Sequence, residues 1–133
     1  MTFKEYCQQL EDVITTSYNR GTNSTDAESF AAQFLQAQIK ISQELAKADM
    51  DSRTRKSGIK AVRAAVYLDI VQNSDKKPTE AQLSAQVDTN EIVQSEQNEY
   101  DKAEVSVAEL ERYYNIFRES HLYYRALMKE RHE

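Results

Sequence analysis

Apolar side chains recur along this chain at alternating steps of three and four residues, which is the spacing of one buried stripe on a helix. The longer of two such series lies in the C-terminal third and consists of Ala103, Val107, Leu110, Tyr114, Phe117, His121, Tyr124 and Met128. The other consists of Phe30, Phe34, Ala37, Ile41, Leu45 and Ala48. Both series predict long amphipathic helices.

The same pattern and the local turn residues divide the rest of the chain. We expect a first helix over residues 2–18, with Tyr18 on its apolar side, and a helical stretch over 53–72. The pattern over 49–52 is compatible with a break or with continuation. Capping boxes at Thr25–Glu28 and Thr79–Gln82 predict two helix starts. The second opens a short helix, and the final helix runs from about 91 to 131.

Composition supports an all-α fold. The sequence contains only 2 glycines and 1 proline, too few for the frequent turns of a β-sandwich or barrel. We therefore predict an elongated helical hairpin or bundle with a long C-terminal helix, in a single domain of residues 1–133. Residues 1–24 form an N-terminal helix that either docks on this domain or stays loosely attached.

The C-terminal helix needs a surface to pack along, because about forty helical residues extend roughly 60 Å. That surface belongs to the rest of the chain or to a neighbouring chain. Since the mean hydropathy of −0.76 is low, we expect the core to be completed in a homo-oligomer. The predicted oligomer interface comprises Leu110, Tyr114, Phe117, His121, Tyr124 and Met128.

Catalytic chemistry finds little support in the sequence. There is no glycine-rich phosphate loop, and neither the single cysteine nor the 2 histidines have metal-ligand spacing. The carboxylates of residues 88–111 are scattered around a helix, as on a solvated face. We expect no enzyme activity, catalytic residue, metal or cofactor. Without a run of about 18 apolar residues or a signal peptide, we expect a cytoplasmic protein with no membrane partner.

Charge is segregated along the chain although the net charge is −5. Residues 53–77 contain 7 basic and 2 acidic side chains, whereas residues 78–111 contain 1 basic and 9 acidic ones. Such segregation indicates a surface that meets a charged partner.

Within the basic segment, Arg53, Lys56, Lys60 and Arg63 fall in an arc of roughly 80° on one helix face, and Tyr67 falls in the same arc. Arg55 points elsewhere but adds to the local field. A row of cations with an aromatic ring in line suits single-stranded nucleic acid, because the cations neutralise phosphates and the ring stacks on a base. We call these five residues of the arc the basic strip.

Another interpretation of the basic strip remains open. The cations are also compatible with a solvated helix face, or with ion pairs to the acidic segment 78–111 of the same or a neighbouring chain. In that case the protein is a non-enzymatic structural or adaptor protein, such as a virion component or a protein-binding inhibitor.

The order of parts over roughly residues 50–130 resembles the recombination mediator proteins of T4-type phages, the UvsY family. The matching run extends from Lys60 to Asp69 and is followed by a polar loop, a short helix from Thr79 and a long helix from near Glu91. The resemblance implies a phage protein of the host cytoplasm that forms a ring-shaped oligomer and binds single-stranded DNA non-specifically. It also implies a role in loading a RecA-like recombinase onto DNA coated by a single-strand-binding protein. On that basis, Lys60 and Arg63 contact DNA and the C-terminal helix mediates assembly.

Overall fold

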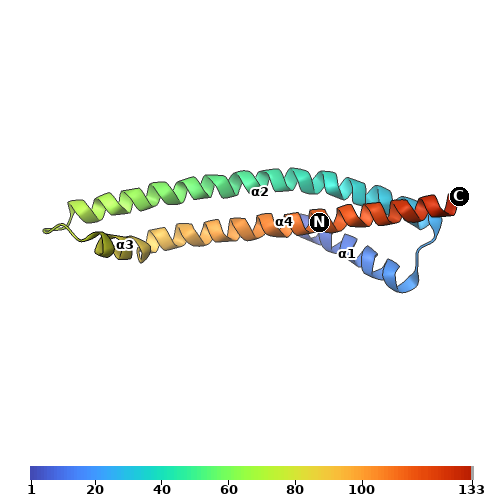
Figure 1. Ribbon diagram of the computed structural model, residues 1–133, viewed down its shortest axis with the longest axis horizontal. Coiled ribbons are helices and arrows are strands. Elements are labelled where there is room, and N and C mark those ends of the chain that lie inside the picture. Colours follow the sequence, from blue (N-terminus) through green and yellow to red (C-terminus); the bar gives the residue numbers. More distant parts are fainter. Residues whose placement is uncertain (133) are drawn as a thin grey trace. The chain divides into compact units, whose positions relative to one another are not determined.

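The computed structural model describes residues 1–132, apart from the side chains of residues 24 and 130–132. Four helices, and no strand, form within the described residues (Figure 1). They are α1 (Phe3–Arg20), α2 (Ser24–Gln72), α3 (Glu80–Asp88) and α4 (Glu91–His132). The predicted all-α fold with a long C-terminal helix is confirmed.

Helix α2 is continuous over 49 residues and joins the two stretches that the sequence suggested on either side of 49–52. No glycine or proline interrupts this junction. Two ion pairs at i,i+4 spacing, Asp49–Arg53 and Asp51–Arg55, cross it with N–O distances of 3.1 Å each. Pairs of this geometry stabilise a helix, so the apolar pattern shifts its phase here without ending the helix.

The helix starts follow local polar residues. Thr79 and Gln82 form the predicted capping box at the start of α3, each accepting the other's backbone N–H. The predicted box at Thr25–Glu28 is wrong. Its place is taken by Asn23, whose side chain accepts the N–H of Asp26 at 2.8 Å, because α2 begins at Ser24, two residues earlier than the box requires. An Asn side chain satisfies the unpaired N–H groups of a first turn equally well.

The chain divides into two compact units. Unit 1 comprises Met1–Leu45 and Glu109–Glu133, and unit 2 comprises Ala46–Ala108. Unit 1 is a bundle of α1, the first part of α2 and the last part of α4 (Figure 1). Helix α1 buries Cys7 and Leu10 in the core of this unit, so residues 1–20 dock on it.

Aromatic side chains form the centre of unit 1. Phe34 of α2 stacks on Tyr124 of α4, with ring centroids 5.6 Å apart and planes 7° apart, and its centroid lies 5.4 Å from that of Phe117. His121 is half-buried, and its Nδ1 lies 2.8 Å from the backbone oxygen of Ala31. The histidine thus serves packing between α4 and α2.

The predicted oligomer interface requires correction. Phe117 and Tyr124 are 0% and 2% exposed within the chain itself, so neither is available to a neighbouring chain. Leu110, Tyr114, His121 and Met128 are half-buried. The apolar stripe of α4 is therefore real, but in unit 1 it is covered mainly by the chain's own helices.

Two positions on or near the apolar stripes of unit 1 differ from expectation. Tyr18, placed on the apolar side of the first helix, is 89% exposed, because in the last turn of α1 the half-buried position falls on its neighbour Ser17. Cys7 was not singled out, yet it is buried. The pKa of its thiol is raised to about 11, mainly because the thiol is buried and also because the carboxylates of Glu11 and Glu109 are nearby.

Unit 2 has a smaller core. Helix α2 and the first part of α4 run antiparallel, with α3 connecting them (Figure 1). The buried side chains are Ile59, Leu83, Val87, Val93 and Ala103, and no aromatic ring is among those the structure describes here. Half-buried polar residues, including Ser52 on α2 and Glu96 on α4, interrupt the apolar stripes. No helix in the described part of the chain combines the length and apolarity that crossing a bilayer demands.

The core role of Phe117 leads to a prediction about stability. Phe117→Ala should lower the free energy of unfolding by about 3–5 kcal/mol, because it removes a fully buried ring and leaves a cavity. Urea denaturation followed by circular dichroism measures the change. Tyr18→Ala, at an exposed position, should shift it by less than about 0.5 kcal/mol. A Phe117→Ala protein of unchanged stability but altered assembly mass would contradict the core assignment.

The two glycines should respond in opposite ways to alanine. At Gly58, inside α2, an added Cβ meets no heavy atom within 4 Å, so Gly58→Ala should stabilise the protein by up to about 1 kcal/mol through helix propensity. At Gly21 the φ angle is +78°, and Gly21→Ala should destabilise because a Cβ disfavours that conformation. Thermal unfolding of both variants tests this, and a lower stability of Gly58→Ala would contradict it.

Candidate nucleic-acid interface

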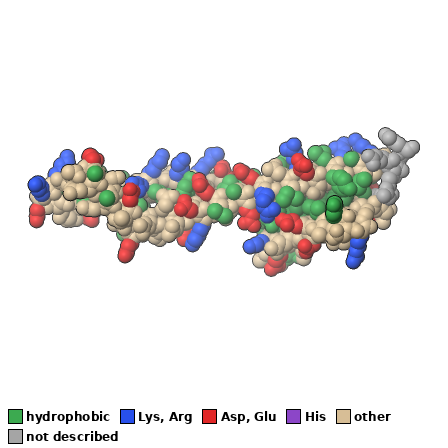
Figure 2. All heavy atoms as spheres, turned by 60° about the horizontal axis from the view of Figure 1, so that its bottom comes forward, with side chains coloured by type: hydrophobic (Ala, Val, Ile, Leu, Met, Phe, Trp, Pro, Cys, Tyr) green, Lys and Arg blue, Asp and Glu red, His purple; other side chains and the backbone are tan. Residues whose placement is uncertain are grey.

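The basic strip lies on one uninterrupted stretch of α2 within unit 2. Because the helix is regular from residue 53 to 67, the strip keeps its arc of roughly 80° and extends about 21 Å along the axis. Its centre lies roughly a quarter of the circumference away from the stripe that contains buried Ile59. In the part of the molecule that contains α3, Lys and Arg side chains project in succession along one edge, with acidic side chains near them (Figure 2).

Two arginines of the basic segment pair with carboxylates on their own helix. Arg53 bonds Asp49 and Arg55 bonds Asp51. The Arg53 side chain remains 81% exposed. Surface pairs of this kind contribute at most about 1 kcal/mol, because water and salt screen them. A phosphate in the same place can replace the aspartate as partner.

Lys56 and Lys60 are exposed on the same face. Neither forms an ion pair with any residue that the structure describes. A lysine ammonium surrounded by water is a mobile point charge that meets a phosphate without first giving up another partner. Within the described residues, these two lysines are consequently the cations of the strip that no carboxylate partners.

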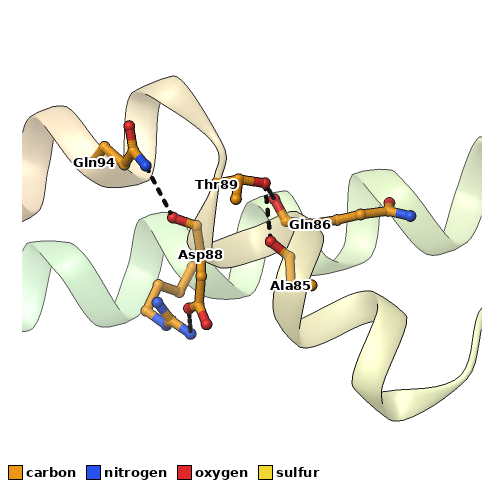
Figure 3. A network of polar contacts seen from close by, with 6 residues as sticks. Ala85, Gln86, Asp88, Thr89 and Gln94 are labelled. Carbon is orange, nitrogen blue, oxygen red and sulfur yellow. Dashed lines mark hydrogen bonds and ion pairs between the residues drawn. The ribbon is translucent and has the colours of Figure 1, made fainter.

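Arg63 has a partner from another helix. Its Nη2 donates to Oδ1 of Asp88, at the end of α3, over 2.8 Å. The side chains are 41% and 57% exposed, respectively, so the pair lies at the surface. The Asp88 backbone oxygen also accepts a 3.4 Å hydrogen bond from the side-chain amide of Gln94, as Figure 3 shows. This ion pair connects α2 to α3.

Tyr67 lies beside an apolar hollow at the end of the strip. The hollow is lined by Arg63, Ala64, Tyr67, Leu68 and Val87. Tyr67 is 36% exposed and Leu68 is 56% exposed. Among the residues described, no aromatic ring or cation lies against the Tyr67 ring. The Tyr67 side chain is thus partly exposed to solvent next to a cation.

The acidic segment 78–111 neutralises the strip at a single described position, Asp88. Elsewhere in unit 2 its charged groups interact locally. Glu99 pairs with Lys102 at 3.4 Å. Tyr100 donates a hydrogen bond to Glu104, and this bond raises the pKa of the Tyr100 hydroxyl. The basic and acidic segments therefore remain distinct surfaces in most of unit 2.

The structure places the predicted site residues as follows. Arg53, Lys56, Lys60, Arg63 and Tyr67 share one face, and Arg55 lies off it and half-buried. Pairing of the strip with the acidic segment 78–111 was one of the alternatives left open, and it occurs at Arg63–Asp88. Which carboxylate pairs, and the hollow at Leu68, were not predicted, because both arise where α3 returns to α2. Within the described part of the chain, no three His, Cys, Asp or Glu side chains are grouped so as to hold a metal ion.

Comparison of the chain with protein-family models, with curated proteins and with solved structures found no match.

Proposed function

We propose that this protein is a phage-type accessory protein that binds single-stranded DNA non-specifically through the basic strip of α2. The proposal rests on one observation: a row of exposed and half-buried cations ends at a partly exposed aromatic ring, and Lys56 and Lys60 in this row have no ion-pair partner among the described residues. Phosphates would lie along the cations, releasing condensed counterions, and a base would stack on Tyr67. The contacts proposed here are to phosphates and to the face of a base, which carry little sequence information, so the proposed binding is non-specific.

Binding by one strip of about 21 Å involves few phosphates, so a single chain binds weakly. Copies of the strip in a homo-oligomer would act together through effective concentration. In unit 1 the apolar stripe of α4 is largely covered by the chain's own helices, so the proposed oligomer contacts lie on other surfaces. Exposed apolar side chains on the outer face of α2 in unit 1, Leu35 and Ile39, are 47% and 56% exposed and available for such contacts.

The finer part of the proposal is a role as a recombination mediator that helps a RecA-like recombinase displace a single-strand-binding protein. It is supported by the order of elements in the chain. Helix α2 carries Lys60 and Arg63 and leads to Tyr67, and then α3 and the long α4 follow. The competing proposal, a structural or adaptor protein, uses the same cations for contacts with other proteins and predicts no affinity for an oligonucleotide.

The salt dependence of DNA binding tests the strip. We expect a fluorescently labelled oligonucleotide to bind at low salt, with an affinity that falls linearly on a double-logarithmic plot against salt concentration. Lys56→Gln/Lys60→Gln should weaken binding and reduce the slope by about 1.4, because each lost phosphate contact on a single strand contributes about 0.7. Fluorescence anisotropy at several salt concentrations gives both quantities.

A matched control for that experiment is Lys76→Gln/Lys77→Gln, which removes the same charge from the exposed loop after α2. This variant should retain most of the affinity and the slope. Equal losses in the two double variants would show general charge attraction and no defined strip. Absence of binding by the unaltered protein at low salt would favour the adaptor alternative.

Stacking on Tyr67 gives a separate prediction. Tyr67→Ala should weaken binding by about fivefold to 150-fold, since base stacking contributes about 1–3 kcal/mol, whereas Tyr67→Phe should retain the affinity because it keeps the ring. The salt slope should not change in either variant. Tyr18→Ala, at an exposed tyrosine of unit 1, serves as control. Equal affinity of Tyr67→Ala and the unaltered protein would exclude a stacking role.

A further inference from the structure

The Arg63–Asp88 ion pair sits inside the basic strip, where a phosphate is expected to bind. An aspartate oxygen 2.8 Å from the guanidinium Nη2 occupies one of the positions that a phosphate oxygen would take on the same donor. The two residues are 25 positions apart in the sequence, so the contact depends on the return of α3 toward α2. It is the ion pair in unit 2 that joins two different helices within the described residues.

Arg63 also supports the end of α3. The last turn of this helix contains no basic residue, and Asp88 places a negative charge where the helix dipole is already negative. The guanidinium of Arg63 compensates both charges from the neighbouring helix. A helix of nine residues is not stable by itself, so α3 depends on such contacts and on burial of Leu83 and Val87.

These contacts point to an exchange of partners. We propose that Asp88 acts as an internal competitor of phosphate, holding Arg63 in the absence of DNA and releasing it when a strand occupies the strip. The proposal rests on the DNA-binding function proposed above and names the contact that regulates it. Release leaves the Asp88 charge uncompensated at the C-terminus of α3. DNA binding is thereby coupled to loosening of α3 through a single shared guanidinium.

Arg63 lies between two hollows of unit 2, so a change in its side-chain position alters both of them. Arg63 lines the apolar hollow with Tyr67 and Val87, and it also lines a polar hollow with Asp88, Gln94 and Asn98. When its side chain turns from Asp88 toward the strip, it leaves the polar hollow and approaches the face that carries Lys60. Lys56 and Lys60 need no such exchange, and they provide the initial attraction for the strand.

The test is a double-mutant cycle on oligonucleotide affinity. Asp88→Asn should bind a labelled oligonucleotide about twofold to fivefold more tightly than the unaltered protein, because it removes the competing charge while keeping the shape of the side chain. Asp75→Asn, an equal charge change on the exposed loop, is the control for general electrostatics. In an Arg63→Gln background, Asp88→Asn should produce no more than the effect of Asp75→Asn.

A second measurement follows the coupling to α3. Hydrogen exchange of the amides of residues 83–88 should become faster when the oligonucleotide is bound, and the Asp88→Asn protein should show a smaller increase on binding. Circular dichroism checks that each variant retains its helices. A merely structural role of the ion pair would change the exchange in the unbound protein without changing affinity.

The outcomes separate the two proposals. If the unaltered protein binds and Asp88→Asn matches Asp75→Asn, the competition is refuted and DNA binding stands. If neither the unaltered protein nor Asp88→Asn binds at low salt, both proposals fail. Binding by Asp88→Asn alone would support the competition strongly, since it would mean that the ion pair blocks the site.

Discussion

A long helix can bury one stripe of its surface against a neighbour, and the rest of its circumference stays in solvent. Both long helices of this protein obey that constraint. In unit 1 the buried stripes meet in the packed rings of Phe34, Phe117 and Tyr124. In unit 2 the buried stripe of α2 passes through Ile59. Because the cations from Arg53 to Arg63 are displaced from that stripe around the helix, packing leaves most of them on the surface.

The two units differ in the size and composition of their cores. Unit 1 is closed by aromatic rings and by α1, so a chain of low mean hydropathy still contains an apolar core. Unit 2 has a small core of aliphatic side chains with polar residues in its stripes. Lower local stability is typical of regions that bind and rearrange. The candidate site lies in the unit that has less apolar burial to hold it rigid.

The electrostatics of unit 2 depend on how the cations are partnered. Exposed i,i+4 pairs such as Asp49–Arg53 are weak and exchangeable, and they mainly stabilise the helix across residues 49–52. The Arg63–Asp88 pair is different in kind, because it connects two helices and places a carboxylate in the row of cations. Lys56 and Lys60 lack a described ion-pair partner. One helix face thus carries three kinds of cation: lysines without a described partner, Arg53 in a weak pair on its own helix, and Arg63 in a pair with another helix.

Much of this protein was predictable from spacing along the chain. Steps of three and four residues located the stripes of α2 and α4, the Thr79 capping box located α3, and the basic strip followed from the positions of Arg53 to Tyr67 on one helix. These features are local, since helix geometry alone fixes which residues share a face. The Thr25 box failed because several polar residues near residue 24 compete for the same unpaired N–H groups.

The sequence could not decide what covers each face, because periodicity defines a stripe and does not name the surface it meets. Phe117 and Tyr124 were assigned to a contact between chains, and the fold instead buries them against α2 and α1 of the same chain. The pairing of Asp88 with Arg63, and the hollow between Leu68 and Val87, likewise depend on where the loop after α2 returns α3. Such contacts join residues distant in sequence, and only the tertiary structure determines them.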